Sequence, residues 1–223
     1  MVFLYEEKAG EEFIVLKGES YKYLVKVRRH KIGDTLALRQ KTNPKLLHTY
    51  TITEIEPRSL SLKKVHSQHY EVKAKKSLHV GWCVIDSKSV EKVLASLNEI
   101  GVGGISFIYC ERSQKNFKAD FKRYERIIEA SNQQCGRSDI MEFKVYKNLK
   151  IFLEDYPNVK VFDFTQKVLD TTQNINNILI GCEGGFSAEE KILLAQKDVF
   201  RLDTPLVLRS ESAVLAVSAK ILL

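Results

Sequence analysis

The chain has 223 residues, of which 44% are hydrophobic and 28% charged, with 11 glycines and 4 prolines. This composition is typical of a folded, soluble protein and excludes disordered and collagen-like chains, while the length suits one large domain or two small ones. The first residues lack a basic start and an apolar core, and no run of about 18 uncharged apolar residues occurs. We therefore expect neither a signal peptide nor a membrane span.

The four cysteines lie far apart and form no motif with metal-ligand spacing: they are Cys83, Cys110, Cys135 and Cys182. Without a CxxC pair or a Cys/His cluster, the sequence predicts neither a zinc site nor a disulfide framework. A reducing, cytoplasmic compartment is the simplest interpretation, and we expect no metal.

The net charge of +7 is unevenly distributed. Residues 1–70 contain 13 basic and 8 acidic side chains, whereas residues 71–223 contain 22 and 20. A basic first part favours a polyanionic partner such as nucleic acid. A solvated lysine-rich surface explains the charge equally well.

The first part of the chain is a series of short segments with the alternating pattern of strands, at residues 13–15, 35–38, 50–55 and 60–62. One helical stretch, Tyr21 to Val27, precedes the Gly33-Asp34 turn. We predict a small β-barrel or open β-domain over residues 1–71. The lysine-rich stretch 72–76 is the best candidate for its boundary with a second domain, residues 72–223.

The second part alternates strands with helices, which predicts parallel strands joined by crossover helices in an α/β domain. We expect strands at residues 78–85, 105–109, 159–164 and 177–180, and helices at 86–100 and 121–135. A short strand at 206–208 is predicted to lead into a C-terminal helix.

A glycine-rich turn, residues 181–186, follows the predicted strand at 177–180. Ser187 and Glu190 then form a capping box, which starts a helix. The carboxyl end of a parallel strand is where α/β proteins place ligands. The turn lacks the motifs of phosphate loops, and Glu183 would repel phosphate. It therefore indicates a site for a nucleoside or a sulfonium ligand, although an ordinary tight turn fits the spacing equally well.

Three other polar clusters stand out. Ser210 and Glu211 are explained as the cap and first turn of the C-terminal helix, but Arg209 needs an anionic or carbonyl partner. Arg112 follows another strand end, and Arg137 closes a helix. Basic residues crowd the helix and turn of the first part, where they would contact RNA phosphates or form a solubilising surface: Lys22, Lys26, Arg28, Arg29 and Lys31.

Several ordered blocks resemble the RsmE-type family of 16S rRNA uridine-N3 methyltransferases, members of the SPOUT superfamily. Residues 181–187, GCEGGFS, are similar to the family's GPEGGFS, and residues 206–213, LVLRSESA, to its ILRTETA. Residues 134–137 (QCGR), 111–113 (ERS), 99–102 (EIGV) and 27–29 with 33–34 (VRR and GD) resemble further blocks in the same order. Ser96 and Tyr23 depart from residues that are usual in the family.

The resemblance implies a PUA-like RNA-binding domain followed by a SPOUT domain with a C-terminal trefoil knot, acting as a homodimer on 16S rRNA of the small ribosomal subunit. It implies S-adenosyl-L-methionine as cofactor. The residues that would surround the cofactor are Leu179, Gly181, Glu183, Gly184, Gly185, Leu202, Leu206, Leu208 and Ser210.

The chemistry implied is methyl transfer to N3 of uracil, which becomes nucleophilic only when its proton leaves and negative charge spreads onto O2 and O4. Arg209 is the first candidate to stabilise this charge, followed by Arg112 and Arg137, and Glu211 is a candidate base or orienting group. Two alternatives remain open. One is a SPOUT enzyme that methylates a ribose hydroxyl or another RNA, and the other is a non-catalytic rRNA-binding assembly factor.

Overall fold

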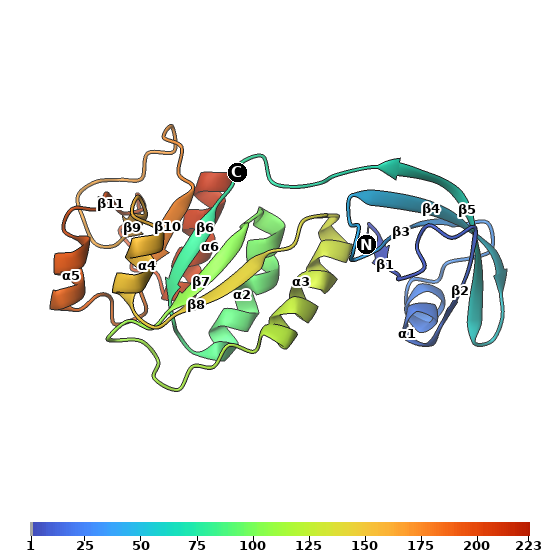
Figure 1. Ribbon diagram of the computed structural model, residues 1–223, viewed down its shortest axis with the longest axis horizontal. Coiled ribbons are helices and arrows are strands. Elements are labelled where there is room, and N and C mark those ends of the chain that lie inside the picture. Colours follow the sequence, from blue (N-terminus) through green and yellow to red (C-terminus); the bar gives the residue numbers. More distant parts are fainter. Residues whose placement is uncertain (1) are drawn as a thin grey trace. The chain divides into compact units, whose positions relative to one another are not determined.

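The structure, a computed structural model, describes residues 2–223. The chain forms two compact units (Figure 1): the first contains Met1–Lys73 and Asn132–Asp139, the second Ala74–Ser131 and Ile140–Leu223. Each unit has its own hydrophobic core. The contacts of the segment from Asn132 to Asp139 place it in the first unit. The two units therefore cannot be separated by a single cut in the sequence.

The first unit is built on a curled five-stranded sheet with the order β1-β3-β4-β5-β2. Its strands are β1 (Leu4–Tyr5), β2 (Phe13–Lys17), β3 (Thr35–Arg39), β4 (Leu46–Ile55) and β5 (Ser59–His69). β1 pairs with β3 in parallel, and the other pairs are antiparallel. The predicted β-rich unit is confirmed.

Alternation along β2 places Ile14 and Leu16 in the core and leaves Phe13 and Val15 exposed, as the period of a half-buried strand requires. The helix predicted over residues 21–27 starts earlier: α1 (Gly18–Tyr21) continues into η1 (Lys22–Val27), which has π-helical hydrogen bonding. Short π-helical turns are uncommon and often occur at functional sites.

The second unit contains a six-stranded sheet with the order β11-β9-β10-β6-β7-β8, and every pairing in it is parallel. The strands are β6 (His79–Cys83), β7 (Gly104–Ile108), β8 (Glu142–Tyr146), β9 (Lys160–Phe162), β10 (Asn177–Ile180) and β11 (Val199–Phe200). The predicted parallel α/β architecture is confirmed. Figure 1 shows β6, β7 and β8 side by side, as their registers require.

The helices of this unit are α2 (Ser87–Ile100), α3 (Phe121–Cys135), α4 (Leu149–Asp155), α5 (Ala188–Leu194) and α6 (Ser210–Leu222), and only the last four residues of α3 group with the first unit. α2 begins where the Asp86 side chain accepts a hydrogen bond from the Ser89 amide, and it ends at Gly101, whose φ of 106° suits glycine. α6 packs against α2. A glycine inside β6 has a packing role, because a Cβ at Gly81 would overlap the ring of Phe152 on α4.

One predicted strand is wrong. Residues 206–208 are irregular, and Leu206 and Val207 are exposed. Apolar residues in a short run indicate a strand only when a sheet is available to bury them, and here the chain turns past a cavity instead. β1, β8, β11 and α4 were not predicted from the sequence.

Candidate functional site

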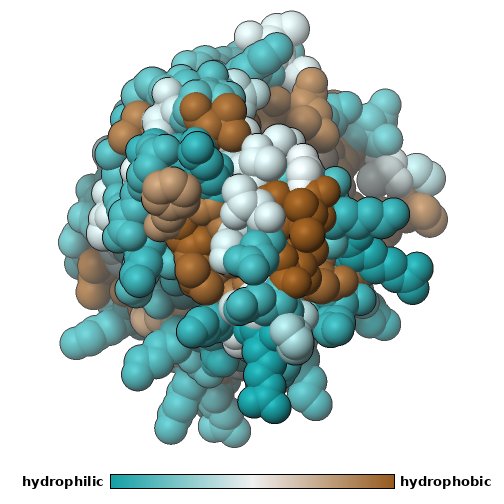
Figure 2. Space-filling view, turned by 90° about the vertical axis from the view of Figure 1, so that its right-hand side faces the viewer, coloured by the Kyte–Doolittle hydropathy of each residue, from teal (hydrophilic) through white to brown (hydrophobic). Residues whose placement is uncertain are grey.

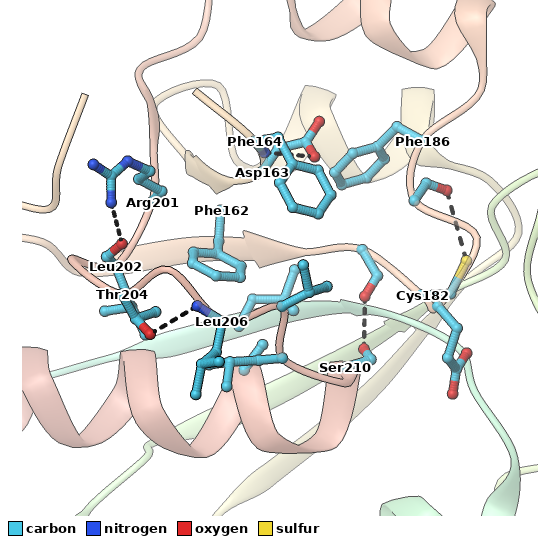
Figure 3. Close-up of a pocket in the computed structure, with 17 residues that line it drawn as sticks. Phe162, Asp163, Phe164, Cys182, Phe186, Arg201, Leu202, Thr204, Leu206 and Ser210 are labelled. Atoms are coloured by element: carbon cyan, nitrogen blue, oxygen red, sulfur yellow. Dashed lines mark hydrogen bonds between the residues drawn. The ribbon is translucent and has the colours of Figure 1, made fainter. Parts of the chain in front are cut away.

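A cavity lies where β9 and β10 end and where the segment between β11 and α6 crosses them (Figure 3). Three stretches line it: residues 162–164, residues within 180–186, and residues within 201–213. The space between these residues is about 800 Å³ when the open solvent at the mouth is included.

The glycine-rich loop forms one wall of the cavity. Gly185 has a φ of 64°, and its amide donates to the Cys182 carbonyl at 2.9 Å, which closes a tight turn. Ser187 then caps α5: its side chain accepts a hydrogen bond from the Glu190 amide, and the Glu190 carboxylate accepts one from the Ser187 amide at 2.9 Å. The predicted capping box is confirmed, and it fixes where the loop ends.

Ser210 joins the loop to the core. Its hydroxyl donates to the Gly181 carbonyl at 2.6 Å and accepts from the Trp82 indole at 2.8 Å. The sequence predicted that Ser210 caps α6, but the N-cap residue is Arg209 and no side chain caps this helix. Ser210 is instead buried, and its hydroxyl bonds polar groups from two distant parts of the chain.

The loop after β7 is bound to the glycine-rich loop and to α5 by three contacts. The Glu111 amide donates to the Glu190 carboxylate at 2.8 Å, and the Arg112 guanidinium donates to the Gly184 carbonyl at 2.8 Å. The Cys182 thiol is 3.2 Å from the Arg112 carbonyl, to which it donates. Arg112 thus supports the wall of the cavity from outside it.

Two cysteines near the strand ends, Cys83 and Cys182, have raised pKa values. Burial raises the pKa of Cys182. The pKa of Cys83 is raised mainly by burial and to a smaller extent by a hydrogen bond with Cys110. Because the thiolate is the reactive form, these groups are unsuited to act as nucleophiles. Within residues 2–223, no group of three or more His, Cys, Asp or Glu side chains is arranged to hold a metal ion.

The structure brings most of the predicted cofactor residues to the cavity. Its lining includes Gly181, Glu183, Gly185, Leu202, Leu206, Leu208 and Ser210. Leu179 is buried inside β10, and Gly184 faces Arg112 instead of the cavity.

The predicted catalytic residues are placed differently. Arg209 is exposed, between two lining residues of the chain, and Glu211 is half-buried in the first turn of α6. Arg137 is buried in the first unit, where its guanidinium binds both oxygens of Asp139 at 2.9 and 2.6 Å. This two-point ion pair gives Arg137 a structural partner, and it does not line the cavity.

The basic residues predicted to bind RNA are exposed on and after η1: Lys22, Lys26, Arg28, Arg29 and Lys31. Arg29 has a φ of 60°, a conformation that costs a non-glycine residue about 1–2 kcal/mol. Lys22 pairs with Glu19 at 2.8 Å. Figure 2 faces the right-hand end of Figure 1 and shows hydrophilic side chains around apolar patches. The exposed apolar residues of the first unit include Phe13, Val27 and Ile32.

Sequence reasoning missed one side of the cavity. Phe162, Asp163 and Phe164 line it at the end of β9, and Arg201 and Thr204 line it after β11. The only signal for the first group was its position at the carboxyl end of a predicted parallel strand. No sequence pattern indicated that β9 and β10 are neighbours, and β11 is only two residues long.

The parallel sheet and the cavity at its carboxyl edge define an α/β ligand-binding protein, and a family model described as an RNA methyltransferase domain matches residues 72–222. The chain belongs to this RNA methyltransferase family. The chain is 37% identical over 223 residues to the Ribosomal RNA small subunit methyltransferase E of Helicobacter pylori, with 98% of each chain covered. The resemblance inferred from the sequence motifs is confirmed.

Solved structures share the fold. A Ribosomal RNA small subunit methyltransferase E from Neisseria gonorrhoeae, bound to S-adenosyl methionine, is 17% identical with a TM-score of 0.77, covering 99% of this chain and 96% of that one. A methyltransferase from Legionella pneumophila in complex with the same cofactor is 21% identical, with the same TM-score and coverage. Among residues 2–223, no helix has both the length and the apolar character needed to cross a membrane.

Proposed function

We propose that this protein transfers the methyl group of S-adenosyl-L-methionine to N3 of a specific uridine in 16S rRNA of the small ribosomal subunit. The observation that carries the proposal is the cavity of the glycine-rich loop, in a chain whose relative at 37% identity is named for methylation of small-subunit ribosomal RNA. The identity of the acceptor atom rests on the family resemblance of the site blocks.

The lining of the cavity fits this cofactor. Apolar walls from Phe162, Ile180 and Phe186 suit a purine ring, and the carboxylates of Asp163 and Glu183 suit ribose hydroxyls or a cationic group. Arg201 is the single basic residue among the described lining residues, and its guanidinium already contacts the Leu202 carbonyl and Asp203. The site therefore favours a nucleoside with a positive centre over a phosphate ligand.

When bound, S-adenosylmethionine supplies an electrophilic methyl group. For the transfer to balance, the bond from N3 to the methyl carbon forms, the sulfur–methyl bond breaks and the N3 proton leaves to a base or to water. Arg209 is exposed at the N-terminus of α6, beside Leu208 and Ser210 of the cavity wall. We assign it to stabilise the negative charge on O2 and O4 of the uracil.

The other three candidate catalytic residues are assigned supporting roles around Arg209. Glu211, in the first turn of α6, is assigned to orient Arg209 or to accept the proton. Arg112 is assigned to position the glycine-rich loop, since its guanidinium donates to the Gly184 carbonyl. Arg137 is assigned to hold the segment after α3 through Asp139.

The first domain, residues 1–71, is proposed as a PUA-like RNA-binding domain. Its curled sheet and the exposed basic residues around η1 support this assignment. Residues 72–223 are proposed as a SPOUT domain with a C-terminal trefoil knot. Three separate stretches that surround one cavity, together with the packing of α6 on α2, support it. A homodimer is proposed on the family resemblance alone, and light scattering tests it.

The experiment that tests the function is incubation of the protein with labelled S-adenosylmethionine and small ribosomal subunits, or free 16S rRNA, from a strain that lacks the enzyme. Mass spectrometry of the nucleosides should identify 3-methyluridine. A ribose-methylated nucleoside would instead indicate the alternative SPOUT reaction. Cofactor binding without any methylated product would indicate a non-catalytic assembly factor.

A further inference from the structure

Three large apolar residues stand exposed at the mouth of the cavity. Phe164, Leu206 and Val207 are 80%, 72% and 77% accessible to solvent, and all three line the cavity. Apolar groups gathered at the mouth of a pocket, and not scattered singly, usually mark a binding surface. Because a cofactor would occupy the cavity itself, the side chains at the mouth of the cavity remain available to contact a second molecule that approaches from solvent.

Phe164 is placed to contact an incoming molecule more than the cofactor. It follows Phe162 by two residues, so both side chains can lie on the same side of the chain as β9 ends. Phe162 is half-buried and Phe186 is 2% exposed, so the inner walls are already apolar without Phe164. In the view of Figure 3, Phe164 and Phe186 are drawn above the cavity and Leu206 below it. Most of the surface of Phe164 nevertheless faces solvent.

We propose that Phe164 is the stacking platform for the acceptor nucleobase of the RNA, with Leu206 and Val207 as the apolar surface opposite. The inference rests on the proposed function. A base can receive a methyl group on its ring only when that edge is freed from pairing, and an unstacked base is stabilised by an aromatic side chain. Stacking needs no charge, which fits the absence of a basic residue in this group of three.

The position of the catalytic candidate agrees with this proposal. Leu206, Val207 and Arg209 belong to one irregular segment that ends at α6. A base held between Phe164 and this segment would present its carbonyl oxygens near the exposed guanidinium of Arg209. The same short segment would thus hold the face of the base and stabilise its charge.

The test compares Phe164→Leu, which keeps apolar area but removes the aromatic ring, with Phe164→Trp, which keeps a ring. Ile192→Ala is the matched control, because Ile192 is 75% exposed on α5 and does not line the cavity. Three quantities are measured for each variant: kcat/KM with RNA varied, the Kd of S-adenosylmethionine by calorimetry, and the molar mass by light scattering.

We expect Phe164→Leu to lower kcat/KM for RNA by about 10- to 100-fold, the range for losing one base–aromatic stack, while Phe164→Trp stays within about threefold. The Kd of the cofactor and the molar mass should match those of Ile192→Ala. Three results would each overturn the proposal: an unchanged kcat/KM, a parallel loss of cofactor affinity, which would make Phe164 an adenine contact, or a changed mass, which would make it a contact between copies.

Failure of the proposed function is a separate outcome. If the proposed function fails, the wild-type protein forms a methylated nucleoside other than 3-methyluridine. If the stacking role fails, the failure is seen only when the Phe164 variants are compared with the wild-type protein. If the wild-type protein methylates no RNA at all, both proposals are overturned together.

Discussion

Glu190 offers the sharpest test of how the site is held together. The residue is 8% exposed, and its carboxylate accepts one hydrogen bond from the Ser187 amide and one from the Glu111 amide, at 2.9 and 2.8 Å. The first bond is local to the start of α5, but the second links α5 to the loop after β7. The Glu190→Gln substitution keeps the size and shape of the side chain but leaves one oxygen where two are needed.

The expected loss follows from these two bonds. A hydrogen bond to a charged group contributes about 1.5–3 kcal/mol, and a buried donor left unsatisfied costs about 1–3 kcal/mol. The NH₂ group of glutamine would also face one of the two backbone N–H donors, and two donors cannot form a hydrogen bond with each other. We therefore expect Glu190→Gln to lower the free energy of unfolding of the second unit by about 2–4 kcal/mol. It should also weaken S-adenosylmethionine binding, because α5, which follows the glycine-rich loop directly, loses its attachment to the loop after β7.

Glu189→Gln is the matched control. Glu189 is exposed in the same first turn of α5, so both substitutions remove a negative charge near the helix N-terminus. That shared loss is about 0.3–1 kcal/mol, and the difference between the two variants isolates the hydrogen bonds. Denaturant unfolding followed by tryptophan fluorescence reports on this unit, because Trp82 lies in its core. Equal stability of the two variants, within about 0.5 kcal/mol, would refute the reasoning.

Three further predictions concern catalysis, RNA binding and pH. Arg209→Ala should lower kcat by about 100- to 1,000-fold, the usual loss for one charge-stabilising donor, while the Kd of the cofactor measured by calorimetry stays within about twofold. Full activity in that variant would contradict the assignment. Lys26→Ala combined with Arg29→Ala should weaken RNA binding and lower the slope of log K against log salt by about one unit per residue, whereas the exposed Lys88→Ala on α2 should change neither if the first unit is the RNA-binding one. Burial lowers the pKa of His79 from 6.5 to about 4, and the positive charge of a nearby lysine makes a smaller contribution in the same direction. Between these two pH values the unfolded chain binds a proton that the folded chain does not, so stability should fall as the pH drops from about 6.5 to about 4. His79→Gln should flatten this part of a denaturant-unfolding profile, and an unchanged pH dependence would exclude the histidine as its cause.

The parts predicted correctly from the sequence depend on interactions between near neighbours. The capping box of Ser187 and Glu190 spans three residues, and the end of α2 at Gly101 depends on the backbone freedom of that one residue. The alternation in β2 likewise reports a local period. Such features are visible in the sequence because the groups that interact are only a few residues apart.

The errors have a common physical origin. The apolar run at 206–208 resembles a strand, but the chain offers it no neighbouring strand, so these residues stay irregular at the mouth of the cavity. Ser210 has the chemistry of a helix cap, yet its hydroxyl finds Gly181 and Trp82, which are 29 and 128 positions away. In both cases, distant partners override a local preference.

The sequence by itself determined the β-rich first part, the parallel α/β second part and the glycine-rich loop, because periodicity and capping are properties of short segments. The tertiary structure decided that β9 lies beside β10, and so that Phe162 and Phe164 share a cavity with Gly181. It also placed the Arg112 guanidinium on the Gly184 carbonyl, 72 positions away. The order of strands in a parallel sheet depends on how crossover segments pack, and no local pattern encodes it.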